Sequence, residues 1–286
     1  MNVFKTGLLL SVLTVLLVFV GQLIGGAQGM TTAFIFALVM NLGSYWFSDK
    51  IVLAMYRAKP LNEAEAPQVY RVVKEIAARE GMPMPKLYWL PTVTPNAFAT
   101  GRSPKHAAVA VTSGLLEIMN EEELKGVLAH ELSHVKNRDT LVMSIAAAIA
   151  GAISMLASWA RWGLMMGGNR GRGERNNSGA AVQLVAMIMI AILAPLAAMV
   201  IQLAISRTRE YGADATGARI TGNPQGLASA LEKLDRAVHA HPLEGANPAT
   251  AHLFIVNPLR ADVFTKLFST HPPVEERVRR LRAMAA

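Results

Sequence analysis

From Thr6 to Ser48 the chain carries no charged side chain. A helix needs about 20 apolar residues to cross a bilayer whose hydrocarbon core is about 30 Å thick. The run is therefore long enough for two spans, and Gly25, Gly26 and Gly29 are expected to break it into helices near 7–25 and 31–48. Since no convincing small-x-small cleavage site follows the first apolar stretch, we interpret residues 1–56 as a retained transmembrane hairpin.

Two further stretches lack charge, 140–160 and 176–206, and a Gly/Arg/Asn-rich loop at about 166–178 joins them. Hydrophobic residues make up 52% of the 286 residues, and the mean hydropathy is +0.31. Both values are high for a soluble globular protein. We expect an integral membrane protein with up to four spans, in which residues 139–205 form a second membrane helix pair.

The basic residues next to the first apolar run predict its orientation. Lys5 precedes the first span, and Lys50, Arg57 and Lys59 follow the second. Because basic residues flank spans on the cytoplasmic side, both ends of the hairpin are expected in the cytoplasm. The net charge of +8 is explained by basic residues of this kind, which lie next to spans or are scattered through helical stretches. No aromatic residues are interleaved with them, so we expect no nucleic-acid partner.

The remaining segments, 57–138 and 206–286, have the composition of a soluble domain. Apolar spacing predicts a helix over 63–80, and short strands are expected at 86–90, 96–101 and 107–112. Asn120 and Glu123 form a capping-box pattern that begins a helix reaching His134. Further helices are expected near 206–219, 224–240 and 272–284.

The predicted helix after Asn120 contains His130-Glu131-Leu-Ser-His134, which matches H-E-x-x-H. Residues four apart lie on one helical face, so both imidazoles can reach the same ion. Zinc accepts neutral histidine nitrogen in tetrahedral sites. Glu131 would lie beside the metal, where its carboxylate can take a proton from water. The chain has no cysteine, which excludes a thiolate-bound metal.

A catalytic zinc needs a third protein ligand, and Glu210 is the candidate. Asp214 follows at i+4, so the two carboxylates share one face of a helix. This spacing suits Glu210 as a ligand and Asp214 as the acceptor for the N–H of a ligating histidine. The alternative is a helix with two solvated acids. The same ligands could also hold cobalt or manganese.

These motifs resemble the gluzincin pattern of zinc metallopeptidases. The two N-terminal spans, Ser206 to Asp214, and Ser269 to Arg277 are similar to the HtpX-like family of membrane-bound proteases, which is related to prenyl-protein (CAAX) endopeptidases. The resemblance covers nearly the whole chain. It implies a mainly α protein, in which integral membrane helices accompany an α+β catalytic domain with a small sheet, and one Zn²⁺ per chain.

The resemblance also implies roles for residues outside the ligand set. Asn96, Ala97 and Phe98 are similar to an edge strand that pairs with an extended substrate. A strand that only enters a turn is the alternative. His271 is expected near the site as a catalytic group that stabilises the oxyanion, with Arg277 close by. Helix capping or packing is an equally good interpretation of His271.

The ligand set constrains the topology. His130 and Glu210 must lie on the same side of the membrane, so the stretches between them cross together or not at all. Crossing would place Arg170, Arg172 and Arg175 on the far side, against the positive-inside preference. Cysteine labelling of the 168–177 loop in intact cells distinguishes the two arrangements.

We therefore expect a multi-pass zinc endopeptidase of the bacterial inner membrane, with its active site facing the cytoplasm. The resemblance implies polypeptide substrates, namely misfolded or damaged membrane proteins, in a stress-linked quality-control role. Three alternatives are open: a prenyl-protein endopeptidase, a non-catalytic zinc-stabilised scaffold in the bilayer, and a small-molecule metallohydrolase.

Overall fold

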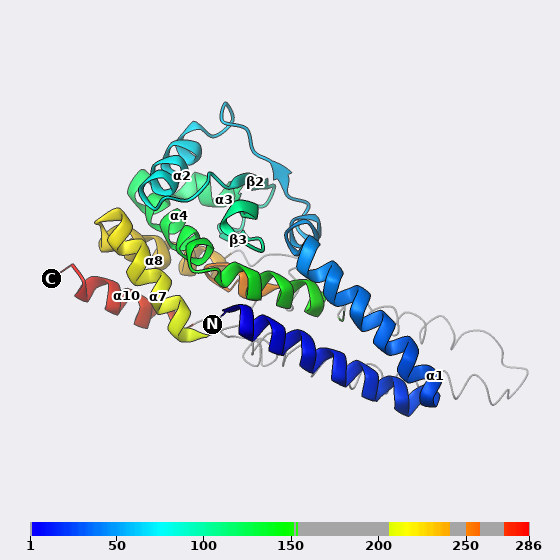
Figure 1. The fold of residues 1–286 in the computed structure, drawn as a ribbon. Helices are drawn as coiled ribbons and strands as arrows, with labels where there is room; N and C mark the ends of the chain where they lie inside the picture. Colours follow the sequence, from blue (N-terminus) through cyan, green and yellow to red (C-terminus); the bar gives the residue numbers. More distant parts are fainter. Residues whose placement is uncertain (1, 152, 154–205, 241–249, 258–271, 286) are drawn as a thin grey trace, which may run out of the picture.

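A computed structural model describes residues 2–151, 153, 206–240, 250–257 and 272–285. Most of the expected second membrane pair, including the 166–178 loop, lies outside the described residues, and so does His271. The described part consists of an N-terminal helical hairpin and a body of helices around a small sheet (Figure 1).

The hairpin is the element α1, Asn2–Met55, which reverses at Gly25 and Gly26. Gly26 has φ +58°, a left-handed conformation that glycine adopts at little cost. The reversal uses two of the three glycines expected to break the run. The second arm is longer than expected, because its helix starts directly after Gly26 and continues to Met55. Within the described residues, Gly25–Met55 is the one helix long and apolar enough to cross a membrane.

The two arms of α1 are held together by small and polar residues. The Asn41 side-chain amide donates to the Leu10 carbonyl oxygen at 3.3 Å and to the Thr14 hydroxyl at 2.8 Å. Gly21 and Gly29 meet so closely that a Cβ on Gly29 would lie 2.2 Å from the Gly21 oxygen. Close approach through small residues and interhelical hydrogen bonds is typical of helix pairs in lipid.

The sheet has four strands in the order β1-β2-β4-β3. Their bounds are Lys59–Pro60 (β1), Lys86–Leu90 (β2), Ala97–Thr100 (β3) and Ala108–Thr112 (β4). β2 and β4 are parallel, whereas β1 and β3 run antiparallel to their neighbours. The three strands predicted from the sequence are present, and the 96–101 stretch is an edge strand as expected.

Helices cover the sheet and form most of the body. Their bounds are Pro67–Arg79 (α2), Ser113–Ile118 (α3), Glu121–Lys136 (α4), Asp139–Gly151, Arg207–Thr221 (α7), Pro224–Ala240 (α8) and Val274–Ala283 (α10), with short 3-10 turns at Pro104–His106 (η1) and Ala251–Leu253 (η2). α2 begins later than expected because Pro67 occupies its first turn, where the missing N–H costs nothing.

α4 lies at the centre of the body and contacts α2, α7, α8 and β3 (Figure 1). Its start is fixed by the expected capping box, in which Asn120 and Glu123 satisfy each other's backbone N–H groups. Val127, Leu128 and Leu132 are fully buried in the main apolar core. From Gly126 to Val135 every residue of the helix is buried, the polar ones included, whereas Glu121, Glu122 and Lys136 at its ends are exposed.

The helix Asp139–Gly151 connects the body to the hairpin. Met143 and Ala147 pack with Val52 from the end of α1 and with Phe98 from β3. The Ser144 hydroxyl accepts the backbone N–H of Gly101 at 3.1 Å. The base of the hairpin, the sheet edge and this helix therefore form one packed unit.

Candidate metal centre

The H-E-x-x-H sequence lies in the second half of α4 with all its side chains buried. His130 is 1% exposed, and Glu131 and His134 are each 3% exposed. The Nε2 atoms of the two histidines lie 3.3 Å apart, as expected for histidines on one helical face. A buried cluster of this polarity is costly unless each group is paired or coordinates a metal.

α7 reaches this face because it packs very closely on α4. Gly217 lies against the α4 backbone, where an added Cβ would come within 3.0 Å of the His130 nitrogen. Glu210 and Asp214 are both buried at this contact. α7 ends at Gly222, which has φ +69° and caps the helix in a left-handed conformation.

Three ligand atoms converge between α4 and α7. Nε2 of His134 lies 3.5 Å from a Glu210 carboxylate oxygen, and Nε2 of His130 lies 3.8 Å from the other. Ligands about 2.0–2.1 Å from a tetrahedral zinc ion are separated by about 3.3–3.4 Å. When each of the three residues offers one ligand atom, these atoms lie within 4.8 Å of one another, so the set can hold one such ion.

Asp214 and Arg277 orient the first histidine. Nδ1 of His130 lies 2.9 Å from Oδ1 of Asp214, which leaves Nε2 for the metal. Arg277 donates to both Asp214 oxygens, at 2.7 and 2.8 Å, and to the Ile255 carbonyl oxygen at 2.8 Å. Burial opposes ionisation of Asp214, but the Arg277 guanidinium and the hydrogen bonds lower the pKa of the carboxyl to about 2. The ion pair therefore keeps Asp214 ionised near neutral pH, so that it can accept the hydrogen bond from Nδ1–H of His130.

Glu131 lies next to the ligand atoms with no positive group bonded to it among the described residues. Its carboxylate accepts the backbone N–H of Ala99 in β3. Burial, together with the charge of Glu210, raises the pKa of Glu131 to about 8 in the metal-free protein, against the attraction of His134. A carboxylate with a raised pKa beside a metal is suited to accept and return a proton.

His134 is held by carboxylates. Burial lowers the pKa of His134, but Asp139, Glu210 and Glu131 together raise it to about 9 in the metal-free protein. His130 has the opposite balance, since burial lowers its pKa more than Asp214 raises it. The two histidines therefore start from different protonation states before a metal binds.

Of the residues expected to bind substrate, Asn96 directly precedes β3, and Ala97 and Phe98 lie on it, beside the metal centre. Asn96 is buried, and its side-chain amide donates to the Val256 carbonyl oxygen at 2.8 Å. The Ala97 carbonyl oxygen accepts the Ile255 N–H at 3.2 Å. Phe98 is fully buried against the rings of Tyr56 and Phe254. All three residues thus have partners within the chain, and the edge position next to Glu131 belongs to Ala99.

The sequence analysis did not identify Asp139 as a residue of the site. One of its oxygens lies 3.2 Å from Nδ1 of His134, and its side chain is buried. Its position five residues after His134 lies outside the i+4 spacing of a continuous helix. The only signal in the sequence is a short charged segment, Lys136 to Asp139, between two apolar stretches.

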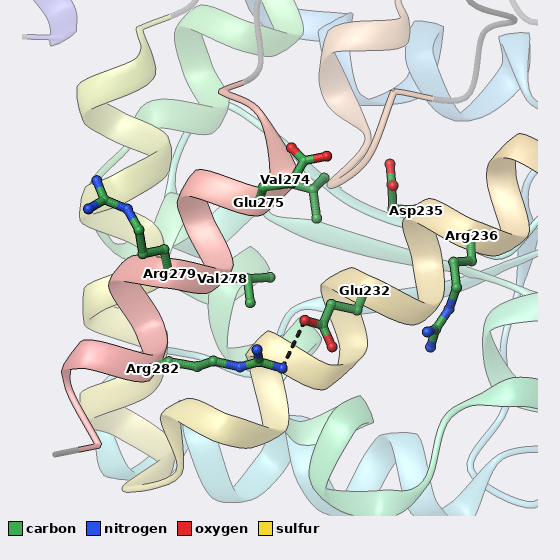
Figure 2. A pocket seen from close by; sticks show the side chains of 8 residues that line it. All are labelled: Glu232, Asp235, Arg236, Val274, Glu275, Val278, Arg279 and Arg282. Carbon is green, nitrogen blue, oxygen red and sulfur yellow. Dashed lines mark hydrogen bonds and ion pairs between the residues drawn. The ribbon is translucent and has the colours of Figure 1, made fainter.

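A separate hollow lies on the outer face of α8 and α10, where an ion pair joins Arg282 and Glu232 at 2.8 Å (Figure 2). Its lining mixes acidic and basic residues around two valines: Glu232, Asp235, Arg236, Val274, Glu275, Val278, Arg279 and Arg282. Arg277 is not among these residues, since its side chain is buried at the metal centre. The hollow is therefore a surface feature distinct from that centre.

The H-E-x-x-H helix, the carboxylate ligand on a second helix and the buried base define the class of HExxH metallopeptidases. A family model for peptidase family M48 matches residues 63–285, and the chain belongs to this family. It is similar to the protease HtpX homolog of Syntrophobacter fumaroxidans, with 58% identity over 98% of this chain and 99% of the relative. The protease HtpX homolog of Pyrococcus furiosus is 56% identical, over 98% of this chain and 95% of the relative.

The fold is also that of a solved structure, S. mikatae Ste24p. The two share 20% identity with a TM-score of 0.50, over 96% of this chain and 62% of that chain. The likeness supports the mainly α architecture with a small sheet. Together with the family, these findings make the protein a membrane-associated metalloprotease.

Proposed function

We propose that the protein is a membrane-anchored zinc endopeptidase whose metal ligands are His130, His134 and Glu210. The observation that carries this proposal is the convergence of three side chains: the two histidine Nε2 atoms lie 3.3 Å apart, and each lies 3.5 or 3.8 Å from one of the two Glu210 oxygens. Three protein ligands leave a fourth position for water or substrate, as catalytic zinc requires. Glu131 lies beside that position.

In this mechanism the side chains of the protein orient the ligands and move protons. A bound zinc ion supplies Lewis acidity, which polarises a peptide carbonyl and makes a water molecule more acidic. Glu131 takes the proton from the attacking water and passes it to the leaving amine nitrogen. Asp214, fixed by Arg277, holds His130 with Nε2 towards the ligand site. His271, proposed to stabilise the oxyanion, lies outside the described residues.

The substrate is proposed to bind in extended form along β3. This strand lies at the sheet edge, and the Ala99 N–H contacts the Glu131 carboxylate, so a peptide paired to this edge passes the base. The groups of Asn96 and Ala97 already bond the 255–256 segment. We propose that the substrate pairs with the Asn96, Ala97 and Phe98 stretch once that segment moves away from Asn96 and Ala97. At Ala99 the N–H is already donated to Glu131.

The hairpin, residues 1–56, is proposed to span the inner membrane of a bacterium with both ends in the cytoplasm. Large apolar side chains such as Phe19, Phe34 and Leu38 point outward from α1. Near its end, the Arg102 guanidinium lies 4.6 Å from the Trp46 ring, an arrangement that suits the interface between lipid and water. Segments 57–138 and 206–286 would form the cytoplasmic catalytic domain, and 139–205 a second membrane pair.

The proposed substrates are misfolded or damaged membrane proteins, cut in their cytoplasmic parts. An edge strand binds a peptide mainly through main-chain hydrogen bonds, which suits substrates of varied sequence. A farnesylated CAAX peptide assayed beside an unfolded membrane protein separates this role from that of a prenyl-protein endopeptidase. Cleavage of the prenylated peptide alone would replace the proposal.

Glu131→Gln tests the mechanism. We expect it to lower kcat by at least about a hundredfold, because general-base catalysis contributes about 10²–10⁴. Its metal content, measured after purification in chelator-free buffer, should stay at one zinc per chain. His134→Ala should lose both metal and activity. Normal cleavage by Glu131→Gln would sink the mechanism, and metal-free wild-type protein with full activity would sink the metal centre.

A further inference from the structure

The second ligating histidine has an orienting carboxylate of its own. Nδ1 of His134 lies 3.2 Å from Oδ2 of Asp139, and both residues are 3% exposed. This contact matches the one between His130 and Asp214, at 2.9 Å. A metal-bound histidine nearly always gives its other ring N–H to such a group, which fixes the tautomer and the ring orientation.

The backbone after α4 places Asp139 for this contact. α4 ends at Lys136, and Arg138 then adopts φ +59°, a left-handed conformation that is uncommon for residues other than glycine. The turn lets Asp139 begin the next helix while still facing His134. That helix is fixed in turn by the hydrogen bond between the Ser144 and Thr100 hydroxyls, at 2.7 Å.

An arginine also accompanies this carboxylate. Arg209 precedes Glu210 on α7. Burial lowers the pKa of its guanidinium, and the charges of Asp139 and Glu210 oppose that shift. Its Nη1 and Nη2 atoms are buried and have no hydrogen-bond partner among the residues that the structure describes. An unpaired buried guanidinium is costly, so a neighbouring negative charge is its main compensation.

We propose that Asp139 and Arg209 form a second positioning arm, which orients His134 as Asp214 and Arg277 orient His130. Asp139 acts through the histidine ring, and Arg209 balances the carboxylate charge. The two carboxylate–arginine pairs differ in how the arginine contacts the carboxylate. Arg277 donates two hydrogen bonds to Asp214, whereas Arg209 acts on Asp139 through charge. The second arm thus sets metal affinity without bonding the metal, and this inference rests on the metal centre proposed above.

The test measures zinc affinity by competition with a chromophoric chelator and records the visible spectrum of the Co²⁺-substituted protein. We expect Asp139→Asn to weaken affinity by about 10-fold and Asp139→Ala by about 100-fold, the range for loss of such partners. Both should change the Co²⁺ spectrum, which a purely structural role would leave unaltered. Asp139→Asn preserves the side-chain shape, so the test stands even if Asp139→Ala does not fold.

Arg209→Gln should weaken zinc binding in the wild-type background but not in the Asp139→Ala background, and Arg209→Lys should recover part of the loss. Arg219→Gln is the matched control, since Arg219 is exposed on the same helix and bonds only within it. A raised KM in Arg209→Gln with unchanged zinc affinity would overturn the arm in favour of substrate binding. Wild-type affinity and spectrum in Asp139→Ala would overturn it outright, while failure of the wild type to bind zinc would instead refute the proposed metal centre.

Discussion

The hairpin α1 and the body distribute polar and apolar side chains in opposite ways. In α1, large apolar residues such as Phe34 and Trp46 are about half exposed, at 50% and 52%, whereas Ser44 and Ser48 are buried. In the body the main core is aliphatic, and the buried charged residues are gathered at one centre, apart from Glu123 at the start of α4. The first arrangement suits lipid, where helices associate through small and polar residues. The second suits water, where apolar burial supplies the driving force.

The difference shows how each region tolerates polar groups. In the hairpin, Asn41 and Thr14 bond each other and a backbone carbonyl at the contact between the arms. In the body, four buried acids and two histidines lie around the ligand site, and Arg277 balances one of the acids directly. The other acids raise the pKa of His134 in the metal-free protein, and burial together with Glu210 raises that of Glu131. A metal cation can replace the protons that these groups hold.

The largest expected effect is the loss of stability on Leu→Ala substitution, which should differ between the body in water and the hairpin in lipid. Leu231 is fully buried in α8, whereas Leu38 in α1 is 49% exposed. Leu231→Ala should lower the free energy of unfolding by about 2–5 kcal/mol, since it leaves a cavity in a packed core. Leu38→Ala should change it little, because detergent or lipid contacts that side chain in any state. Thermal unfolding in detergent micelles measures both, and equal losses would show that α1 packs against protein rather than lipid.

The sequence predicted the regular parts of both regions well, since they depend on local pattern. β2 and α8 have the predicted bounds, and the glycine break in α1 lies at Gly25 and Gly26. The capping box placed the start of α4 because Asn120 and Glu123 act within one turn. These features follow from periodicity and backbone chemistry alone.

What sequence reasoning missed depends on tertiary contact. β1 has two residues and exists only because β2 pairs with it. Asp139 faces His134 only because Arg138 turns the chain, and the positive φ of an arginine has no sequence signature. Similarly, the partners of Asn96 and Ala97 come from the 255–256 segment, far along the chain. Ligand spacing could suggest the metal centre, but not the side chains that orient it.

A second prediction concerns the charge imbalance in the body. In the metal-free protein the pKa values of His134 and Glu131 are raised to about 9 and about 8, above their unfolded values of about 6.5 and 4.3. The folded state therefore binds more protons, so stability should fall as pH rises from 7 to 9. The hairpin lacks such groups from Thr6 to Ser48 and should not contribute to the slope.

Melting temperatures of metal-free and zinc-loaded protein across pH 7 to 9 measure this effect. Zinc should reduce the slope or reverse it, because a ligating histidine carries no proton on Nε2. Glu131→Gln should remove the part of the metal-free slope that lies below about pH 8. A metal-free protein that becomes more stable over this range would contradict the assigned protonation states.

The smallest expected effect on stability concerns a feature found in both regions, a glycine where two helices come into close contact. In α1 the contact of Gly21 with Gly29 serves packing alone, whereas in the body Gly217 also sets the distance between α7 and the proposed ligands on α4. Gly217→Ala should lower stability by about 1 kcal/mol or more, as overpacking does, and should weaken zinc binding because Glu210 moves with α7. Gly212 is the matched control on the same helix, since an added Cβ there has nothing within 4 Å.

Gly212→Ala should raise stability by about 0.5–1 kcal/mol, the usual gain for alanine over glycine in a helix, and leave the metal affinity unchanged. The pair therefore separates the effect of helix propensity from the effect of interhelical distance. If Gly217→Ala gained stability like Gly212→Ala and kept its zinc affinity, α4 could move away from α7 without disturbing the ligands. The close contact would then serve only packing, as it does in the hairpin, and the two regions would differ in solvent but not in what their glycines do.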